Sequence, residues 1–321
     1  MSSPASIIIV GFNNFDTTTG PCLESLVADP GNARHEIIVV DNCSTDGSSE
    51  KLAAFAALHP QVRPTQNTAN RGYAGGNNDG VALARHEVIV LLNSDTVVPP
   101  GAMTRLAAII GQQQQPIMLG PVTNQAGNEQ KIHTVSGTVD GVLAEGEKWR
   151  DNAGGVLYPS PRLDFFCVAM PVGVYRHLDG LDEGFGRGYY EDTDFSIRAV
   201  LEGVSMLMTE DVFVYHRAGA SFSSVGGKNV HDLMQENKKR LLRKHPDGVV
   251  LHHMRDVNLQ VMARYCQEKE DGIATTGLLY RFENRLRLAQ RQYPRNPVKK
   301  LRYHSRLWRV RRTFYCGDDR R

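Results

Sequence analysis

Short apolar runs that end in polar turn residues recur along the first hundred residues of the chain. Residues 6–10, 36–40 and 88–92 are such runs, and each is followed by Gly, Asn, Ser or Asp. Runs of this length bounded by turn residues are typical of strands buried in a parallel sheet. Residues 17–28 and 48–58 are predicted helices between these strands, so the pattern predicts an α/β fold.

Further elements are predicted along the rest of the chain. Residues 117–119, 165–170 and 212–216 are apolar enough for strands, and residues 229–245 have the spacing of an amphipathic helix. Residues 134–160 are rich in Gly, Asp and Glu without a clear period. We expect irregular structure or a mobile flap in that segment.

The composition is that of a soluble globular protein. The chain has 321 residues, of which 41% are hydrophobic and 22% charged. It contains no apolar run of 18 residues and starts in a strand without a signal segment, so we expect a cytoplasmic protein. Five scattered cysteines without C-x-x-C spacing indicate reduced thiols.

Positive charge is concentrated at the C-terminal end. The net charge is +2, but residues 276–321 carry 14 Lys and Arg against 3 Asp and Glu. From Leu278 to Arg312 the basic residues alternate with Leu, Tyr and Trp, a composition that fits an interfacial helix on anionic lipid. Nucleic-acid binding and a solvated basic tail fit the same composition.

Two of the predicted strands are followed by a carboxylate, Asp41 and Asp95. Ligands of open α/β sheets bind beyond the carboxyl ends of the strands, where Asp95 could hold a divalent cation against phosphate oxygens. A turn or helix cap would also explain Asp95. Between these strands, the glycines of residues 67–78 could let the backbone approach a ligand, and Arg71 could pair with a diphosphate. An ordinary loop is the alternative there, and the spacing is not a dinucleotide fingerprint.

Three acidic residues, Glu191, Asp192 and Asp194, lie where a helix is predicted to begin. Helix capping explains one or two of them. Clustered carboxylates raise one another's pKa, which suits a group that must accept a proton. His216 ends a predicted strand, and Ser221 follows five residues later.

Taken in order, these motifs resemble glycosyltransferase family 2. The resemblance is carried by residues 7–14, 39–46, 70–77 and 92–95, by the E-D-x-D pattern at 191–194, and by the H-x-x-x-x-S pattern at His216. Asn93 stands where the family's D-x-D motif has its first Asp, as in the rhamnosyltransferase-like branch. The resemblance covers about residues 5–225.

The resemblance implies a glycosyltransferase A-type fold, which is a Rossmann-like, mostly parallel sheet with flanking helices. We expect a catalytic domain at residues 1–225, with a nucleotide-binding half at about 1–98 and an acceptor half at about 99–225. Residues 226–321 would form a helical, basic C-terminal extension. The implied activity is transfer of a hexose or deoxyhexose, with rhamnose as one candidate, from a nucleotide-diphosphate donor with inversion.

The resemblance also implies roles for individual residues. Asp192 would be the general base beside Glu191, and Asp95 and His216 would hold Mn²⁺ or Mg²⁺. The polar segment 120–130 would line the acceptor pocket, unless it is an ordinary solvent loop. The residues expected to bind the nucleotide sugar are Val10, Phe12, Asn13, Asp41, Arg71, Gly72, Asn77, Asn93 and Ser94. Those expected at the acceptor are Asn124, Asn128, Tyr190 and Asp194.

The expected partners are a nucleotide-diphosphate sugar and a glycan or lipid-linked acceptor of bacterial cell-surface polysaccharide synthesis. The basic segment would bring the protein to the inner face of the plasma membrane. A sugar nucleotidyltransferase and a non-catalytic nucleotide- or glycan-binding module are alternatives. No nucleic acid is expected as a partner, because nucleic-acid binding would rest on the basic tail alone.

Overall fold

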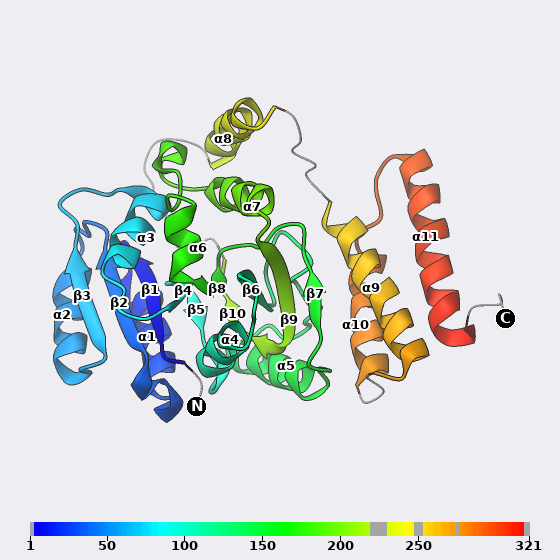
Figure 1. The fold of residues 1–321 in the computed structure, drawn as a ribbon, viewed down its shortest axis with the longest axis horizontal. Coiled ribbons are helices and arrows are strands. Elements are labelled where there is room, and N and C mark those ends of the chain that lie inside the picture. Colours follow the sequence, from blue (N-terminus) through cyan, green and yellow to red (C-terminus); the bar gives the residue numbers. More distant parts are fainter. Residues whose placement is uncertain (1–2, 219–229, 247–252, 274–276, 318–321) are drawn as a thin grey trace.

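The computed structural model describes residues 3–218, 230–246, 253–273 and 277–317 (Figure 1). Within these ranges, eight strands form one sheet in the order β3-β2-β1-β4-β8-β6-β9-β7. Neighbouring strands run parallel except that β8 is antiparallel to β4 and β6, and β7 is antiparallel to β9. The strands are β1 (Ala5–Gly11), β2 (Glu36–Asp41), β3 (Val62–Gln66), β4 (Val88–Asn93), β6 (Ile117–Val122), β7 (Leu157–Pro159), β8 (Cys167–Pro171) and β9 (Ser205–Phe213). The predicted α/β fold with a mostly parallel sheet is confirmed.

A separate two-stranded ribbon joins β5 (Thr96–Val97) to β10 (Tyr215–His216). Helices cover both faces of the large sheet, and a helical unit stands at the C-terminal end (Figure 1). The helices are α1 (Thr19–Val27), α2 (Ser48–Leu58), α3 (Gly72–Ala82), α4 (Ala102–Gly111), α5 (Val139–Asp151), α6 (Val172–His177), α7 (Glu191–Leu201), α8 (Val230–Lys244), α9 (Met254–Asp271), α10 (Leu278–Gln290) and α11 (Pro297–Cys316).

The apolar strands are buried because both faces of the sheet are covered. Ile7 and Ile9 of β1 point into one cluster, which contains residues of α1 and α4. Ile8 points to the opposite face and packs in a second cluster with residues of α3, α6 and α7. Alternate side chains of a strand face opposite sides, so a strand covered on both sides is apolar throughout, as the sequence pattern indicated.

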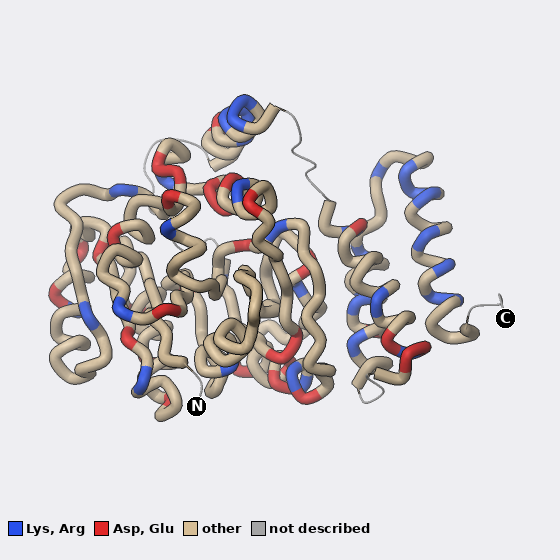
Figure 2. Tube along the Cα trace, viewed as in Figure 1, with Lys and Arg blue, Asp and Glu red and all other residues tan. Residues whose placement is uncertain are grey.

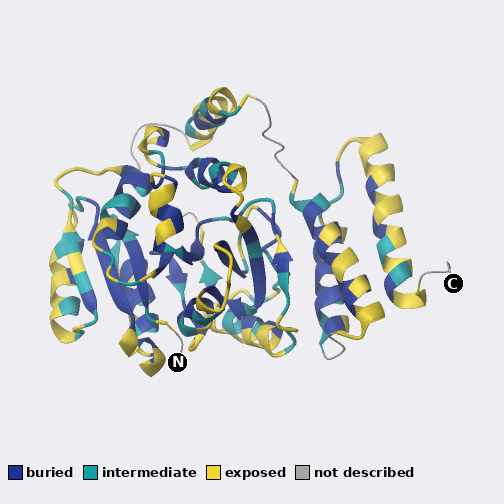
Figure 3. Cartoon of the chain, viewed as in Figure 1, coloured by how far each residue is buried: buried dark blue, intermediate teal, exposed yellow. Residues whose placement is uncertain are grey.

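A third apolar cluster attaches the C-terminal helices to the sheet. Trp149 of α5 and Met208 of β9 pack in it together with Tyr265 of α9, Phe282 of α10 and Phe314 of α11. Figure 3 shows that α9 and α10 each have a buried side and an exposed side, whereas most of α11 is exposed. In the described part of the chain, no helix is long and apolar enough to cross a membrane.

One alternative about local structure holds only in part, and one expectation is wrong. The Gly/Asn segment 67–78 is not a loop throughout, because α3 begins at Gly72. Residues 134–160 contain α5 and the short strand β7. The buried stripe of α5 is Val142, Gly146 and Trp149, and Gly146 packs so tightly that a Cβ there would lie 2.1 Å from the Phe213 ring. Because Gly146 takes the place of an apolar residue in this stripe, the apolar residues of α5 do not recur at the helical period in the sequence.

The expectation of an interfacial helix across residues 278–312 is also wrong for its first part. Arg281 and Arg285 of α10 are fully buried, so these two cations face the protein interior and not a lipid surface. The basic residues of α11, which Figure 2 marks along the right-hand helix, are all exposed to solvent.

Candidate functional site

The carboxyl ends of β2, β1 and β4 lie side by side at one edge of the sheet. Val10 is paired with Asn93, and Gly11 is paired with Asp41, so these predicted nucleotide-binding positions are neighbours. The loops after β1 and β2 are joined by hydrogen bonds. The Asn13 amide donates to Ser44 Oγ at 2.8 Å, and the Thr45 amide donates to Asn13 Oδ1 at 2.8 Å. Asn13 adopts a left-handed backbone with φ 55°, a conformation that Asn tolerates better than most residues.

A cavity of about 450 Å³ lies beside this edge and is lined by all four of the predicted catalytic and metal-binding residues. It extends from the end of β4 to the start of α7 and to the ribbon strand β10. The predicted residues that line it are Asn93, Asp95, Tyr190, Glu191, Asp192 and His216. Segments about 120 residues apart in sequence therefore meet in one cavity.

Asp95 and His216 form one pair in this cavity. The ribbon pairs His216 with Thr96, and this brings His216 Nε2 to 3.4 Å from Asp95 Oδ1. His216 Nδ1 lies 2.9 Å from the Gln125 carbonyl oxygen, which can only accept, so Nδ1 carries a proton. The second nitrogen, Nε2, therefore faces the Asp95 carboxylate.

The surroundings hold this imidazole in place. The His216 ring is stacked on Phe166, with ring centroids 5.3 Å apart. The Asn124 side chain binds the His216 backbone twice, accepting from its amide at 2.9 Å and donating to its carbonyl at 3.0 Å. Burial lowers the pKa of His216, but the hydrogen bond with Asp95 raises it, and the net direction is upward.

The pair fits a divalent cation site with two protein ligands. Among the described residues, no group of three His, Cys, Asp or Glu side chains converges as a complete metal site. A carboxylate and an imidazole suit Mn²⁺, and a carbonyl that accepts from the other ring nitrogen is the usual support of a metal-binding histidine. Such a cation would need oxygen atoms from a ligand or from water to complete its coordination.

Glu191 and Asp192 begin α7 and differ in exposure. Glu191 is 7% exposed, and its Oε2 has no hydrogen-bond partner among the described residues. Burial, and then the nearby Asp192 carboxylate, raise the pKa of Glu191 to about 8. Asp192 is less buried and accepts from its neighbour's amide, Thr193 N, at 2.6 Å. Burial raises the pKa of Asp192 while the Arg162 guanidinium opposes the rise. Asp192 is therefore the better placed of the two to accept a proton.

Sequence reasoning missed two charged residues of the cavity, Arg162 and Asp164. Arg162 Nη2 lies 3.0 Å from Asp164 Oδ1, and Arg162 Nη1 donates to Thr193 Oγ1 at 3.4 Å. Both residues precede β8, which runs antiparallel to β4. The start of β8 therefore lies at the edge where β4 ends. The sequence does show an R-x-D pattern before an apolar strand. This pattern predicts a place in the site only if the direction of that strand in the sheet is known.

Arg71 and the glycines after it lie outside this cavity. Arg71 forms ion pairs with Asp79 and, at 2.8 Å, with Glu183, so its guanidinium is already neutralised by protein carboxylates. Gly72 has φ 68°, and a Cβ there would lie 2.0 Å from the Gly186 carbonyl oxygen. Packing against the protein's own backbone is thus enough to explain this glycine. Asn77 of α3 is buried and donates to the Tyr73 carbonyl at 2.9 Å.

Two of the predicted acceptor residues are part of the protein interior. Asp194 is fully buried and pairs with Arg198 at 2.9 Å and with Lys244 and His245 at 2.8 Å, so it joins α7 to the C-terminal end of α8. Asn128 is 4% exposed and donates to the Arg162 carbonyl at 2.9 Å. These contacts leave both side chains unavailable to an acceptor, which corrects that expectation.

The remaining predicted positions do not line the cavity. They are Val10, Phe12, Asn13, Asp41, Ser94 and Asn124. Ser221 lies outside the described residues, as does the expected domain boundary at 225.

Comparison with known proteins identifies the fold and the family to which the first half of the chain is similar. Residues 6–158 match the family model described as glycosyl transferase family 2. The succinoglycan biosynthesis protein ExoO of Rhizobium meliloti (strain 1021) is 34% identical over 101 residues, which is 32% of this chain and 28% of that protein. The chain thus spans less than a third of this relative.

Two solved structures share the fold at low sequence identity. One is GalNAc-T7 with UDP, GalNAc and Mn²⁺, with a TM-score of 0.58, 16% identity, and coverage of 75% of this chain and 48% of that one. The other is the mannosyltransferase PcManGT from Pyrobaculum calidifontis with GDP-Man and Mn²⁺. It has a TM-score of 0.52, 13% identity, and coverage of 99% of this chain and 89% of that one. The expected glycosyltransferase A-type fold is confirmed.

Proposed function

We propose that the chain, whose residues 6–158 match glycosyltransferase family 2, transfers a sugar from a nucleotide-diphosphate donor to a glycan or lipid-linked acceptor with inversion. The observation that carries this proposal is that the Asp95–His216 pair and Asp192 line the same cavity. One cavity of a size suited to a sugar therefore has a site for the diphosphate and a base for the acceptor hydroxyl. We propose bacterial surface polysaccharide synthesis as the process, in line with the succinoglycan relative.

The proposed reaction is a single displacement at the anomeric carbon. Asp192 accepts the proton of the acceptor hydroxyl while the hydroxyl oxygen bonds to that carbon and the bond to the diphosphate oxygen breaks. Entry and departure on opposite sides invert the configuration. The raised pKa of Asp192 favours this proton transfer, because a base works best when its pKa approaches the working pH.

The donor would lie along the carboxyl ends of β2, β1 and β4. Asp41 would accept hydrogen bonds from the base or ribose, and Asn13 and Asn93 flank the path towards the cavity. Asp95 and His216 would hold Mn²⁺ or Mg²⁺, which when bound offsets the negative charge that develops on the leaving diphosphate. The two solved structures with the same fold contain Mn²⁺ and a nucleotide or nucleotide sugar, which supports this assignment.

A donor screen tests the proposal. Binding of dTDP-rhamnose and of UDP- and GDP-sugars is measured by calorimetry with and without Mn²⁺, on wild type and on Asp95→Asn. We expect metal-dependent binding of one donor that is lost in the variant. The matched control is Asp211→Asn, because Asp211 pairs with Arg105 outside this cavity and should leave binding unchanged.

The same screen separates the alternatives. Donor binding without transfer or hydrolysis would identify a nucleotide- or glycan-binding module. Release of pyrophosphate from a nucleoside triphosphate and a sugar phosphate would identify a nucleotidyltransferase. Absence of any donor binding, with or without metal, would refute the proposed function.

We further propose that α11 rests on an anionic lipid surface. Its inner side is buried through Tyr303, Leu307 and Phe314. Its outer side exposes Leu301, Trp308 and Tyr315, which recur every seven residues and so lie on one side of the helix. Exposed basic residues flank this stripe, namely Lys300, Arg302, Arg309 and Arg311 (Figure 2). An exposed apolar stripe between cations suits the interface of a negatively charged membrane.

Trp308 is a convenient reporter for this contact. Trp149, the other tryptophan, is fully buried, so a change in fluorescence on adding vesicles reports on Trp308. We expect a blue shift with phosphatidylglycerol vesicles, none with phosphatidylcholine vesicles, and loss of sedimentation with vesicles in Leu301→Ala/Trp308→Ala. Leu58→Ala removes an equally exposed leucine of α2 and serves as the control. Equal binding to both lipids would refute the proposed electrostatic contact.

A further inference from the structure

The loop between β6 and α5 lies between the catalytic cavity and the C-terminal helices. Two backbone hydrogen bonds close residues 123–133 into a loop. The Thr123 amide donates to the Gln130 carbonyl, and the Ile132 amide donates to the Thr123 carbonyl. We call these residues the β6 loop. Its two sides make different contacts, and together they connect α10 with the cavity.

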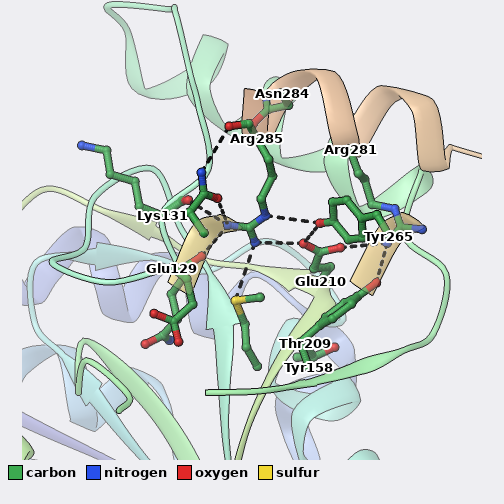
Figure 4. Close-up of polar contacts among 12 residues, drawn as sticks. Glu129, Lys131, Tyr158, Thr209, Glu210, Tyr265, Arg281, Asn284 and Arg285 are labelled. Atoms are coloured by element: carbon green, nitrogen blue, oxygen red, sulfur yellow. Dashed lines mark hydrogen bonds and ion pairs between the residues drawn. The ribbon is translucent and has the colours of Figure 1, made fainter. Parts of the chain in front are cut away.

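On the outer side, Arg285 of α10 holds the β6 loop by its backbone (Figure 4). Its Nη1 donates to the Glu129 carbonyl at 2.6 Å and lies 3.4 Å from the Lys131 carbonyl. Its Nη2 donates to Glu210 of β9 at 2.9 Å, and its Nε donates to Tyr265 Oη of α9 at 3.2 Å. The guanidinium is fully buried, so each donor is occupied inside the protein.

A second residue of α10 holds the far end of the same loop. The Asn284 side chain accepts from the His133 amide at 2.9 Å and donates to the His133 carbonyl at 2.7 Å. Side chains of α10 therefore hold the loop backbone at Glu129, Lys131 and His133, and the loop cannot shift unless these bonds break. The position of the β6 loop therefore depends on α10.

On the inner side, the β6 loop holds residues of the cavity. Asn124 binds the His216 backbone, and the Gln125 carbonyl accepts from His216 Nδ1. Further along, the Gly127 amide donates to Asp164 at 2.5 Å, and Gln130 Oε1 accepts from the Asp164 amide at 2.7 Å. The loop thus supports both the proposed metal-binding histidine and a carboxylate near Asp192.

We propose that Arg285 and Asn284 are positioning residues, through which α10 fixes the β6 loop and so holds His216 with Nε2 towards Asp95. This role rests on the proposed function of the Asp95–His216 pair. The C-terminal helices are then part of the catalytic unit, because the histidine of the site depends on contacts that α10 supplies. Lysine cannot replace Arg285 in this role, since one ammonium group cannot reach two loop carbonyls, Glu210 and Tyr265 together.

Arg281 provides a matched control in the same helix. It lies one turn before Arg285, is equally buried, and donates to Glu210 at 2.9 Å and to Tyr158 Oη at 2.8 Å. It makes no hydrogen bond to the β6 loop among the contacts of the described residues. Loss of stability alone would therefore affect Arg281→Lys and Arg285→Lys alike, whereas loss of positioning affects only Arg285→Lys.

The test compares Arg285→Lys, Asn284→Ala and Arg281→Lys with wild type. Hydrogen exchange of the β6 loop is measured by mass spectrometry on the protein without metal or donor. Binding of Mn²⁺ alone is measured from the free-Mn²⁺ signal in electron paramagnetic resonance. We expect the first two variants to exchange faster in residues 123–133 and to bind Mn²⁺ about 10-fold more weakly, the range found for residues that orient metal ligands. Arg281→Lys should resemble wild type in both.

The outcomes separate this inference from the proposed function. Unchanged loop exchange in Arg285→Lys and Asn284→Ala, or equal effects of all three variants, would overturn the positioning role even if the protein transfers sugar. If wild type binds no Mn²⁺, the proposed metal site fails, and the positioning role fails with it, whatever the exchange shows. If Arg285→Lys does not fold, Asn284→Ala decides, because it removes two hydrogen bonds without leaving an unpaired buried charge.

Discussion

Replacing Glu191 by Gln should make the protein more stable at alkaline pH and leave it nearly unchanged in acid. Glu191 is buried, and its pKa in the folded protein is about 8, against an ordinary value of 4.5. Below pH 4.5 the carboxyl is protonated in both the folded and the unfolded chain. Between pH 4.5 and about 8 the unfolded chain loses the proton while the folded protein keeps it, so the free energy of unfolding falls as the pH rises.

The size of the effect follows from the two pKa values. At about 1.4 kcal/mol for each pKa unit, the difference between 4.5 and about 8 corresponds to a loss on the order of 5 kcal/mol once the pH exceeds 8. Gln has a similar shape and cannot ionise, so the unfolding free energy of Glu191→Gln does not fall in this way as the pH rises. The difference in unfolding free energy between variant and wild type should therefore grow from near zero at pH 4.5 towards that value at pH 8.

The assay is urea unfolding of both proteins at half-unit steps from pH 4.5 to 8.5, without metal or donor. Glu183→Gln is the control of opposite sign, because hydrogen bonding from Asn78 and pairing with Arg71 lower the pKa of Glu183. That variant should be less stable than wild type at neutral pH, and the deficit should shrink as the pH falls below 4.5. A pH-independent effect of Glu191→Gln, or a destabilisation at pH 8, would refute the reasoning.

Two further substitutions test other parts of the structure. Asp192→Asn should lower turnover about 10²- to 10⁴-fold while donor and Mn²⁺ binding persist, because a general base acts in the transition state and not in binding; parallel losses in binding and turnover would contradict that role. Gly72→Ala should lower the free energy of unfolding by about 3 kcal/mol. The new residue would have a left-handed backbone, and its Cβ would overlap the Gly186 carbonyl oxygen. Gly47→Ala, at φ 85° in open space, should lower it by only about 1 kcal/mol in the same urea experiment, and equal effects would show that the close contact is unimportant.

The parallel strands and the residues at their ends could be predicted from the sequence because the signal is local. A buried strand is an uninterrupted apolar run, and its end is marked by the next polar residue, as at Asp41 and Asn93. The carboxyl ends of parallel strands lie at one edge, so local patterns were enough to bring those positions together. The same reasoning failed for Arg162 and Asp164, because β8 runs the other way and the start of the strand, not its end, meets the site.

Charge content misled the prediction for α10 for a different reason. Arg281 and Arg285 were expected at a lipid surface, but their partners are carboxylates of distant elements, Glu210 of β9 and Glu268 of α9. A pattern along one helix cannot reveal a counter-charge on another element, such as Glu210, which precedes Arg281 by 71 residues. Buried ion pairs contribute less to stability than their geometry suggests, because desolvation offsets the attraction, but they do restrict how two elements can dock.

This restriction explains why the helical unit is attached through arginines and not through apolar side chains alone. The third apolar cluster would tolerate small shifts of α10 against β9, because apolar contacts have little directionality. A guanidinium with donors to Glu210, to Tyr265 and to the Glu129 carbonyl at once permits only one arrangement of three elements. That arrangement is the one in which the β6 loop presents its Gln125 carbonyl to His216. In this proposal, Arg285 of α10 defines the position of the loop, and through it the geometry of the proposed metal site.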